Sequence, residues 1–382
     1  MTRVAFKILL HDRAKYLALV LGIAFSTLLI AQQTSIFWSV IVSTTQALRQ
    51  ANAADIWVMR PSVEHVDSVD PLPEIAVNRV RSVAGVAWAV PYYQNTSQAR
   101  TAAGLLKAVT LIGVDDASWV AAPVGQLAMG DLGSLVRPDA VILDTMAFSQ
   151  LFPDQPHRLG DVVEIGQARA QVVGICRVPP SWAGIGFVYT RRSNAARMAR
   201  ETLSPVSFVL AKAREGLSPE EVARRVSRTT GLAAYSRAEF ATKTVVWFLV
   251  NSGVAENFGV TIAMGLIIGV VIVGQTFYMF SADNLKQFAA LKAIGIGNRA
   301  ILGMLMTQAT SVAAVGFGLG VGAAGAFFGL FARSDSGGLR GMYLPPEVFW
   351  ATAAFVLIMT NLACIVSARR VLVVDPAIVF RG

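Results

Sequence analysis

The chain has 382 residues, of which 54% are hydrophobic and only 15% are charged. Soluble domains carry roughly 45–50% apolar and about 25% charged residues, so much of this protein's surface must face something less polar than water. The net charge of +9 would suit nucleic acid, but the segment from Ser43 to Ala255 holds 21 of the 33 basic residues among 18 acidic ones. The other basic residues flank apolar segments, where membrane topology accounts for them, so nucleic-acid binding is disfavoured.

Four stretches are long enough to cross about 30 Å of hydrocarbon as helices, and none contains Asp, Glu, Lys, Arg or His. They run from Leu17 to Val42, Asn257 to Phe280, Ile301 to Phe331 and Val348 to Val366. The first stretch could instead be a cleaved signal peptide. Its apolar run continues past Trp38, which is longer than a signal sequence needs, so a retained membrane anchor is favoured.

The basic residues predict the orientation of these spans. Ten of them lie before the first span, between the second and third, or after the fourth, whereas only Arg333 and Arg340 lie in the other short loop. Positively charged loops stay in the cytoplasm, so both termini are expected there. The ten are Arg3, Lys7, Arg13, Lys15, Lys286, Lys292, Arg299, Arg369, Arg370 and Arg381. Residues 43–256 then form a large domain outside the cytoplasm.

This outer segment has the alternating pattern of a folded α/β domain. Its strand-like runs are Ile56 to Met59, Val109 to Val114, Ala140 to Leu143, Val162 to Ile165, Ala170 to Ile175 and Val206 to Ala211. A weak repeat is also present: Pro73-Glu74, Arg79-Val80 and Gly85-Val86-Ala87 recur as Pro219-Glu220, Arg225-Val226 and Gly231-Leu232-Ala233. The repeat predicts two strand-helix-strand halves in one subdomain, at about 50–110 and 200–240, with a β-rich subdomain at about 111–195 inserted between them. Chance similarity of two ordinary helix starts is the alternative.

Motifs for catalysis and cofactor binding are missing from the sequence. A phosphate-binding loop needs a Gly-Lys pair, and none occurs; nor does a GxSxG or HExxH motif. His11, His65 and His157 are isolated and are expected to be solvated surface residues rather than metal ligands. We therefore expect no enzymatic activity, no bound metal and no cofactor, and no disulfide between Cys176 and Cys364.

The four spans also lack the acids or histidines of ion-coupled transporters. Their polar residues are amides, which are expected to form interhelical hydrogen bonds: Gln32, Gln33, Gln275, Gln308 and Asn361. Glycines at four-residue spacing predict close helix packing at Gly265 with Gly269 and at Gly318 with Gly322, and the same spacing relates Gly316 to Gly320 and Gly325 to Gly329. For the third span, packing within one subunit is favoured over a dimer seam.

The segment from Asp283 to Asn298 predicts a short amphipathic helix in the cytoplasm. Leu285, Phe288, Ala289 and Leu291 share one face, and Gly295 and Gly297 end the helix. Such a helix could lie on the lipid headgroups or fit a groove on a soluble partner, and composition does not separate the two.

At these residues the sequence resembles the FtsX/MacB type of ABC transporter permease, and most closely its DevC subfamily. The matching pieces are Ala54-Asp55-Ile56, GLIIGVVIVGQ from Gly265, QFAALKAIGIGN from Gln287 and DPAIVF from Asp375. In the outer segment, VILD from Val141, LGDVVEI from Leu159 and VVGI from Val172 resemble the periplasmic core domain of MacB. The resemblance implies four membrane helices plus an α/β domain of that type.

The resemblance further implies the working parts of a transporter in the bacterial inner membrane. It implies a homodimeric permease whose coupling helix docks on one of two ATPase subunits, which bind ATP and Mg²⁺. Because MacB carries its ATPase on its own chain, a separate ATPase partner is expected here. The implied coupling residues are Leu285, Lys286, Phe288, Ala289, Leu291 and Lys292.

The expected function is that of a mechanotransmitter, in which ATP hydrolysis moves the outer domain. The cargo would be a hydrophobic or amphipathic molecule passed to a membrane-fusion adaptor and an outer-membrane duct. Two alternatives stay open: a signalling scaffold like FtsX that controls a cell-wall hydrolase, and a permease that extracts lipoproteins.

Overall fold

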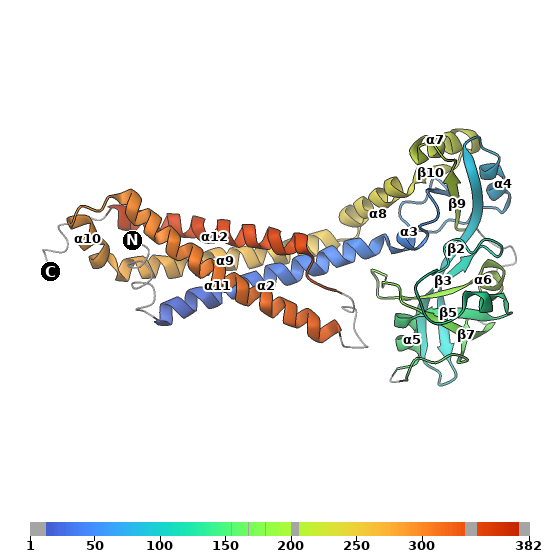
Figure 1. Ribbon diagram of the computed structural model, residues 1–382, viewed down its shortest axis with the longest axis horizontal. Coiled ribbons are helices and arrows are strands. Elements are labelled where there is room, and N and C mark those ends of the chain that lie inside the picture. Colours follow the sequence, from blue (N-terminus) through green and yellow to red (C-terminus); the bar gives the residue numbers. More distant parts are fainter. Residues whose placement is uncertain are drawn as a thin grey trace. The chain divides into compact units, whose positions relative to one another are not determined.

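The computed structural model describes residues 13–153, 155–166, 168–179, 181–199, 206–332 and 342–373 (Figure 1). The chain forms two compact units. One comprises Met1–Trp38, Val254–Arg333 and Met342–Gly382, and the other comprises Ser39–Gly253 and Ser334–Gly341. His11 and the DPAIVF segment lie outside the described residues, as do the side chains of Arg369, Arg370 and Lys286.

The first unit is helical. Its elements are α2 (Arg13–Thr44), α9 (Val254–Asp283), α10 (Leu285–Ala293), α11 (Asn298–Ala332) and α12 (Pro346–Val373). Within the described residues, four stretches are long and apolar enough to cross a membrane: Arg13–Thr44, Val254–Met279, Asn298–Leu330 and Pro346–Ala368. These stretches confirm the four predicted spans. The long helices run alongside one another in Figure 1.

Close contact between α2 and α11 depends on two glycines. A Cβ atom added to Gly316 would lie 2.7 Å from Cβ of Ile23, and one added to Gly320 would lie 2.5 Å from the carbonyl oxygen of Ala24. Real Cβ atoms do not approach other atoms so closely. The missing side chains therefore let the two backbones meet where lipid supplies no hydrophobic force to hold helices together.

Gly318 and Gly322 do not make the predicted packing contact with the described residues, because none of these lies within 4 Å of a Cβ atom added at either position. Two residues turn a helix by about 200°, so this pair faces the opposite side from Gly316 and Gly320.

On α9, Gly269 does pack tightly. Its added Cβ would lie 2.8 Å from Oγ of Ser26 and 2.9 Å from Sδ of Met359. Gly265 makes ordinary contacts at 3.5 Å with Leu29 and Ile30.

We expect Gly320→Leu to destabilise the helical unit by about 1–3 kcal/mol or more, because the side chain would meet the backbone of α2. Gly318→Leu is the matched control on the same helix and should change stability by no more than about 0.5 kcal/mol. Thermal unfolding of the detergent-solubilised protein measures both. Equal losses for the two variants would contradict the packing described here.

The second unit is an α/β domain that holds all ten strands of the described structure. Its elements are α3 (Gln46–Gln50), β1 (Ile56–Met59), α4 (Ile75–Arg81), β2 (Val86–Thr101), β3 (Leu106–Val114), β4 (Leu127–Gly130), the 3-10 helix η1 (Leu132–Val136), β5 (Ala140–Asp144), α5 (Thr145–Leu151), β6 (Val162–Ile165), β7 (Ala168–Cys176), β8 (Gly186–Arg191), α6 (Arg192–Met198), β9 (Phe208–Ala213), α7 (Pro219–Thr230), β10 (Ala233–Ser236) and α8 (Arg237–Asn251). The six predicted strand runs correspond to β1, β3, β5, β6, β7 and β9.

The sequence repeat corresponds to two split strand-helix-strand units. They are β1–α4–β2 and β9–α7–β10, whose strands interleave in the order β10-β1-β9-β2 with every neighbouring pair antiparallel. In α7, Ser218 caps the start, Pro219 opens the first turn and Gly231 ends the helix with φ of 71°. In the first copy the C-cap is Ser82, and Gly85, with φ of 99°, instead lies in the turn before β2.

The β-rich part begins within β2 rather than at residue 111. This strand is 16 residues long, and its first half pairs with β9 while its second half pairs with β3 and β6. It therefore carries the chain from one subdomain to the other without a break, as Figure 1 shows. The predicted boundary near residue 110 falls inside β3.

Strands β2 and β10 are the second strands of the predicted repeat, whereas β4 and β8 correspond to none of the predicted runs. Of these, β8 is central: it pairs in parallel with β3 and antiparallel with β5. Its six residues follow a segment rich in proline and glycine, so little periodicity marks it in the sequence.

An aromatic cluster forms the centre of the first subdomain. The ring of Trp57 is fully buried and lies 5.2–5.9 Å, between ring centroids, from Phe208, Tyr92 and Phe240. Its Nε1 atom has no hydrogen-bond partner in the described structure, so packing and not hydrogen bonding accounts for its contribution.

We expect Trp57→Ala to lower the free energy of unfolding of this domain by about 3–5 kcal/mol, because it empties the centre of the cluster. Leu106→Ala is the control, since Leu106 is 56% exposed, and it should cost less than about 0.5 kcal/mol. Chemical denaturation followed by near-ultraviolet circular dichroism reports both. A loss below about 1 kcal/mol for Trp57→Ala would contradict the assignment.

Candidate functional site

The short helix α10 ends in a well-defined C-terminal motif. The N–H of Gly295 donates to the carbonyl of Lys292 at 2.9 Å, and the N–H of Ile296 donates to the carbonyl of Leu291 at 3.1 Å. Gly295 adopts φ of 98°, which an L-residue with a side chain rarely tolerates. These bonds form a Schellman motif that stops the helix and turns the chain into α11.

One face of α10 packs into the helical unit. Phe288 and Ala289 are fully buried, and Phe288 belongs to a cluster that includes Ile301 and Leu305 of α11. Leu285 and Leu291 are partly buried against the same cluster. The helix is therefore held on the membrane helices by its apolar face.

This placement corrects part of the predicted partner contact. A buried Phe288 or Ala289 cannot present its side chain to a second protein while the helix keeps this position. Lys292 is partly exposed and remains accessible at the end of the helix. Leu285 and Leu291 keep some exposed surface, and the side chain of Lys286 is outside the described structure.

The exposed residues around α10 differ from the predicted set. Ile294, the C-cap residue, is 80% exposed, and Gln287 and Arg299 are also exposed. Single exposed apolar side chains are common on protein surfaces, so Ile294 is one candidate for a contact. The helical-face pattern does not reveal Ile294, because this residue lies just beyond the last helical turn.

An ion pair joins helices α2 and α9 near the place where α9 leads into α10. Lys15 near the start of α2 pairs with Asp283 at the end of α9, and their side chains are 28% and 54% exposed. A pair of this exposure contributes little to stability. The pair shows that the N-terminal end of α2 lies beside the C-terminal end of α9.

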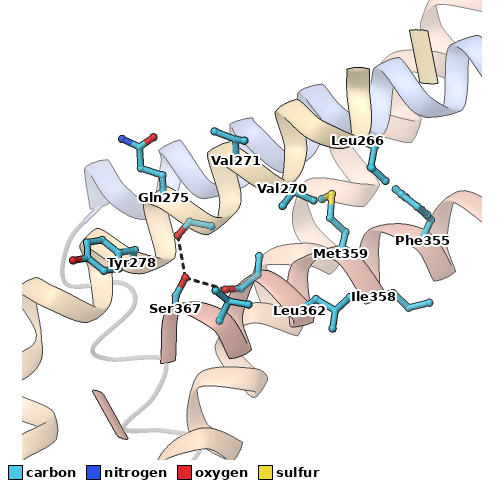
Figure 2. Close-up of a pocket in the computed structure, with 13 residues that line it drawn as sticks. Leu266, Val270, Val271, Gln275, Tyr278, Phe355, Ile358, Met359, Leu362 and Ser367 are labelled. Carbon is cyan, nitrogen blue, oxygen red and sulfur yellow. Dashed lines mark hydrogen bonds between the residues drawn. The ribbon is translucent and has the colours of Figure 1, made fainter. Parts of the chain in front are cut away.

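A lateral groove lies between α9 and α12 (Figure 2). Its volume is about 720 Å³, and it is lined by Leu266, Val270, Val271, Gly274, Gln275, Tyr278, Phe355, Ile358, Met359, Leu362, Ala363, Val366 and Ser367. Ser367 donates hydrogen bonds to the carbonyls of Gly274 at 3.0 Å and Ala363 at 2.9 Å, and so joins the two helices at one end of the groove. The lining carries no ionisable acid or base other than the tyrosine.

Of the predicted interhelical amides, Asn361 lies near a partner on another helix: Oγ1 of Thr310 on α11 donates to its Oδ1 at 3.3 Å. Gln275 instead lies on the groove and is exposed.

A second, polar pocket of about 330 Å³ lies in the α/β domain. The carboxylate of Asp67 accepts hydrogen bonds there from Nε1 of Trp182 at 3.0 Å and Nε2 of Gln94 at 3.1 Å. Part of Asp67 is exposed, yet the surrounding protein desolvates its carboxylate and raises its pKa, and the hydrogen bonds and nearby His65 oppose that rise. These bonds tie the loop after β1 to β2 and to the loop before β8.

His65 is not the freely solvated residue that was predicted. Its ring stacks on Trp247 with centroids 3.9 Å apart and contacts Phe248 at 5.3 Å. Burial lowers the pKa of His65, against the opposing charges of Asp67 and Glu64. The imidazole is therefore neutral near pH 7 and serves in packing. Within the described ranges, no group of three or more His, Cys, Asp or Glu residues could hold a metal ion.

Two family models together match most of the chain. The MacB-like periplasmic core domain matches residues 16–229, which is more than half of the chain, and the FtsX-like permease C-terminal domain matches residues 259–376. The chain belongs to the FtsX/MacB-type family of ABC transporter permeases. This permease is thus a membrane protein with an extracellular domain of the MacB type, and none of the matches separates the DevC subfamily from the rest.

Curated relatives of this permease are also described as ABC transporter permeases. It is 25% identical over 224 residues to an uncharacterised ABC transporter permease of Mycobacterium tuberculosis, and 24% identical over 226 residues to one of Mycobacterium bovis. Each alignment covers 59% of this chain, and the chain spans only 58% of the length of these relatives.

The chain is also similar to solved structures of an extracellular domain and of a periplasmic region. The extracellular domain of the noncanonic ABC-type transporter YknZ from Gram-positive bacteria is 19% identical, with 48% of this chain and 98% of that chain covered and a TM-score of 0.35. The periplasmic region of MacB from Actinobacillus actinomycetemcomitans is 11% identical, with 50% and 92% covered and a TM-score of 0.37.

We expect Phe288→Ala to destabilise the helical unit by about 3–5 kcal/mol, because it leaves a cavity under α10. Ile294→Ala should change stability by less than about 0.5 kcal/mol, since that side chain is exposed. Thermal unfolding in detergent compares the two. If both variants were as stable as the parent protein, α10 would not be anchored as described.

Proposed function

We propose that this permease is a mechanotransmitter that couples ATP hydrolysis in partner subunits to movement of its extracellular domain. The observation that carries the proposal is the anchoring of α10 by its buried Phe288, with Ile294 exposed at its end. A force applied to a helix that is packed into the membrane helices is passed to those helices rather than lost in a flexible loop.

In this proposal the permease is a homodimer in the bacterial inner membrane, with both termini in the cytoplasm and α10 on the cytoplasmic side. Two ATPase subunits bind ATP and Mg²⁺, and this chain binds neither. The absence of a Gly-Lys pair in the sequence supports that division of roles. The distribution of basic residues supports the orientation.

The proposed contact with the ATPase differs in detail from the set predicted on the coupling helix. Ile294 is the apolar anchor, and Lys292 and Gln287 form the polar surroundings. An apolar side chain that enters a pocket on the partner, ringed by polar residues, is the usual arrangement of an energetically important contact. Lys286, Leu285 and Leu291 border this surface, and Phe288 and Ala289 hold it in position.

The proposed cargo is a hydrophobic or amphipathic molecule, passed to a membrane-fusion adaptor and an outer-membrane duct. The apolar membrane helices, whose predicted spans lack Asp, Glu, Lys, Arg and His, do not offer a hydrated path for a charged solute. The permease then acts on the extracellular side, where its domain moves.

We expect Ile294→Asp to weaken binding of the ATPase more than tenfold, which corresponds to about 1.4 kcal/mol, without lowering the stability of the permease. Ile294→Val keeps an apolar side chain and should retain most of the binding. The measurement is copurification and ATPase turnover of the reconstituted complex, with thermal unfolding of each variant as a check.

Two results would contradict this function. Unchanged ATPase binding and turnover in Ile294→Asp would place the residue in lipid headgroups rather than on a partner. Vectorial transport by the permease without any ATPase would remove the need for coupling altogether.

A further inference from the structure

We propose that the groove between α9 and α12 binds one acyl chain of a phospholipid from the membrane leaflet that borders α10. The inference rests on membership in the permease family and on the geometry of the groove, and it does not require the proposed ATPase coupling. In the proposed orientation this leaflet is the cytoplasmic one.

The groove has the length of one leaflet. On α9 its lining runs from Leu266 to Tyr278 and on α12 from Phe355 to Ser367, and each stretch is about 18 Å long at 1.5 Å per residue. Half of a hydrocarbon core about 30 Å thick is about 15 Å. A lipid chain lying along the groove would therefore cross its own leaflet and end near the middle of the bilayer.

The polarity of the groove changes along its length. Figure 2 shows Gln275, Tyr278 and Ser367 toward one end, and Leu266 and Phe355 toward the other. The polar end is the one nearer α10, because Gln275 lies eight residues before the end of α9 at Asp283, or about 12 Å along the helix. An amphiphile with its head near α10 and its tail toward the opposite end matches this gradient.

Gln275 gives the groove a specific polar contact. Its amide is exposed and has no hydrogen-bond partner among the described residues, whereas Ser367 already donates to two carbonyls. An amide without a partner at the edge of the hydrocarbon core is costly. The ester groups of a phospholipid lie at this depth and supply acceptors for the amide N–H groups.

Charge near the polar end favours a phospholipid, and an anionic one in particular. Lys292 and Arg299 follow α9 in the α10–α11 segment, whereas the charge of Lys15 is balanced by its ion pair with Asp283. Basic residues at the membrane surface attract anionic headgroups. The volume of about 720 Å³ falls within the range of roughly 300–1,000 Å³ that is usual for small-molecule sites.

The test uses the full-length permease in lipid nanodiscs of phosphatidylethanolamine and phosphatidylglycerol. A tracer phosphatidylglycerol with a diazirine at mid-chain is photolysed, and the labelled residues are identified by mass spectrometry. The expected result is preferential labelling of Val270 and Met359 in the middle of the groove.

Val270→Trp fills the groove and should reduce labelling of Met359 at least fivefold. Ile267→Trp is the matched control: it is on the same helix, is 57% exposed and does not line the groove, so labelling of Met359 should be unchanged. Gln275→Leu should reduce the phospholipid that copurifies in detergent, and Gln275→Asn should restore it at least in part.

Two outcomes overturn the inference. Labelling spread evenly over the exposed faces of α9, including Met264 and Ile267, or unaffected by Val270→Trp, would mean ordinary boundary lipid. Absence of label from the groove, together with a disulfide between the introduced cysteines of Val270→Cys in two copies, would mean that a second copy covers it. Neither outcome depends on ATPase binding. Failure of the groove proposal would therefore leave the proposed function to its own test, the ATPase binding of the Ile294 variants.

Discussion

Close approach of helix backbones is the constraint on which the membrane part of this permease depends. Lipid tails are as apolar as leucine side chains, so burying apolar surface between two membrane helices gains little. What remains is van der Waals contact, which falls steeply with distance, and a few hydrogen bonds. Gly316, Gly320 and Gly269 permit that contact, and Ser367 adds a bond between α12 and α9.

Helix α10 is anchored in this packed unit and also exposes a residue that a partner could contact. Its apolar residues join the same buried cluster as residues of α11 and α12, while its C-terminal motif presents Ile294 to solvent. Anchoring and exposure are thus divided between the two ends of one short segment. The division explains why a single apolar face in the sequence does not by itself identify the proposed contact surface.

The extracellular domain follows a different physical rule, since water surrounds it and burial of apolar surface stabilises it. Two split strand-helix-strand units share one antiparallel sheet, and β2 extends beyond that sheet to start the β-rich part. A continuous strand of 16 residues gives a stiff connection between the two subdomains. The hydrogen bonds of Asp67 to Trp182 and Gln94 add a polar link at the loops nearby.

The sequence alone determined the features that depend on local pattern: the four apolar spans, the strand-helix-strand repeat, six strand runs and the position of the short amphipathic helix. Each follows from hydrophobic periodicity or from capping residues, which are local in the chain. Tertiary structure decided which faces meet. Four-residue spacing occurs in both Gly316–Gly320 and Gly318–Gly322, and only the approach of α2 selects the first pair. Likewise, only the fold buries Phe288, stacks His65 on Trp247 and opens a groove beside Gln275, because each depends on a neighbour that is distant in the chain.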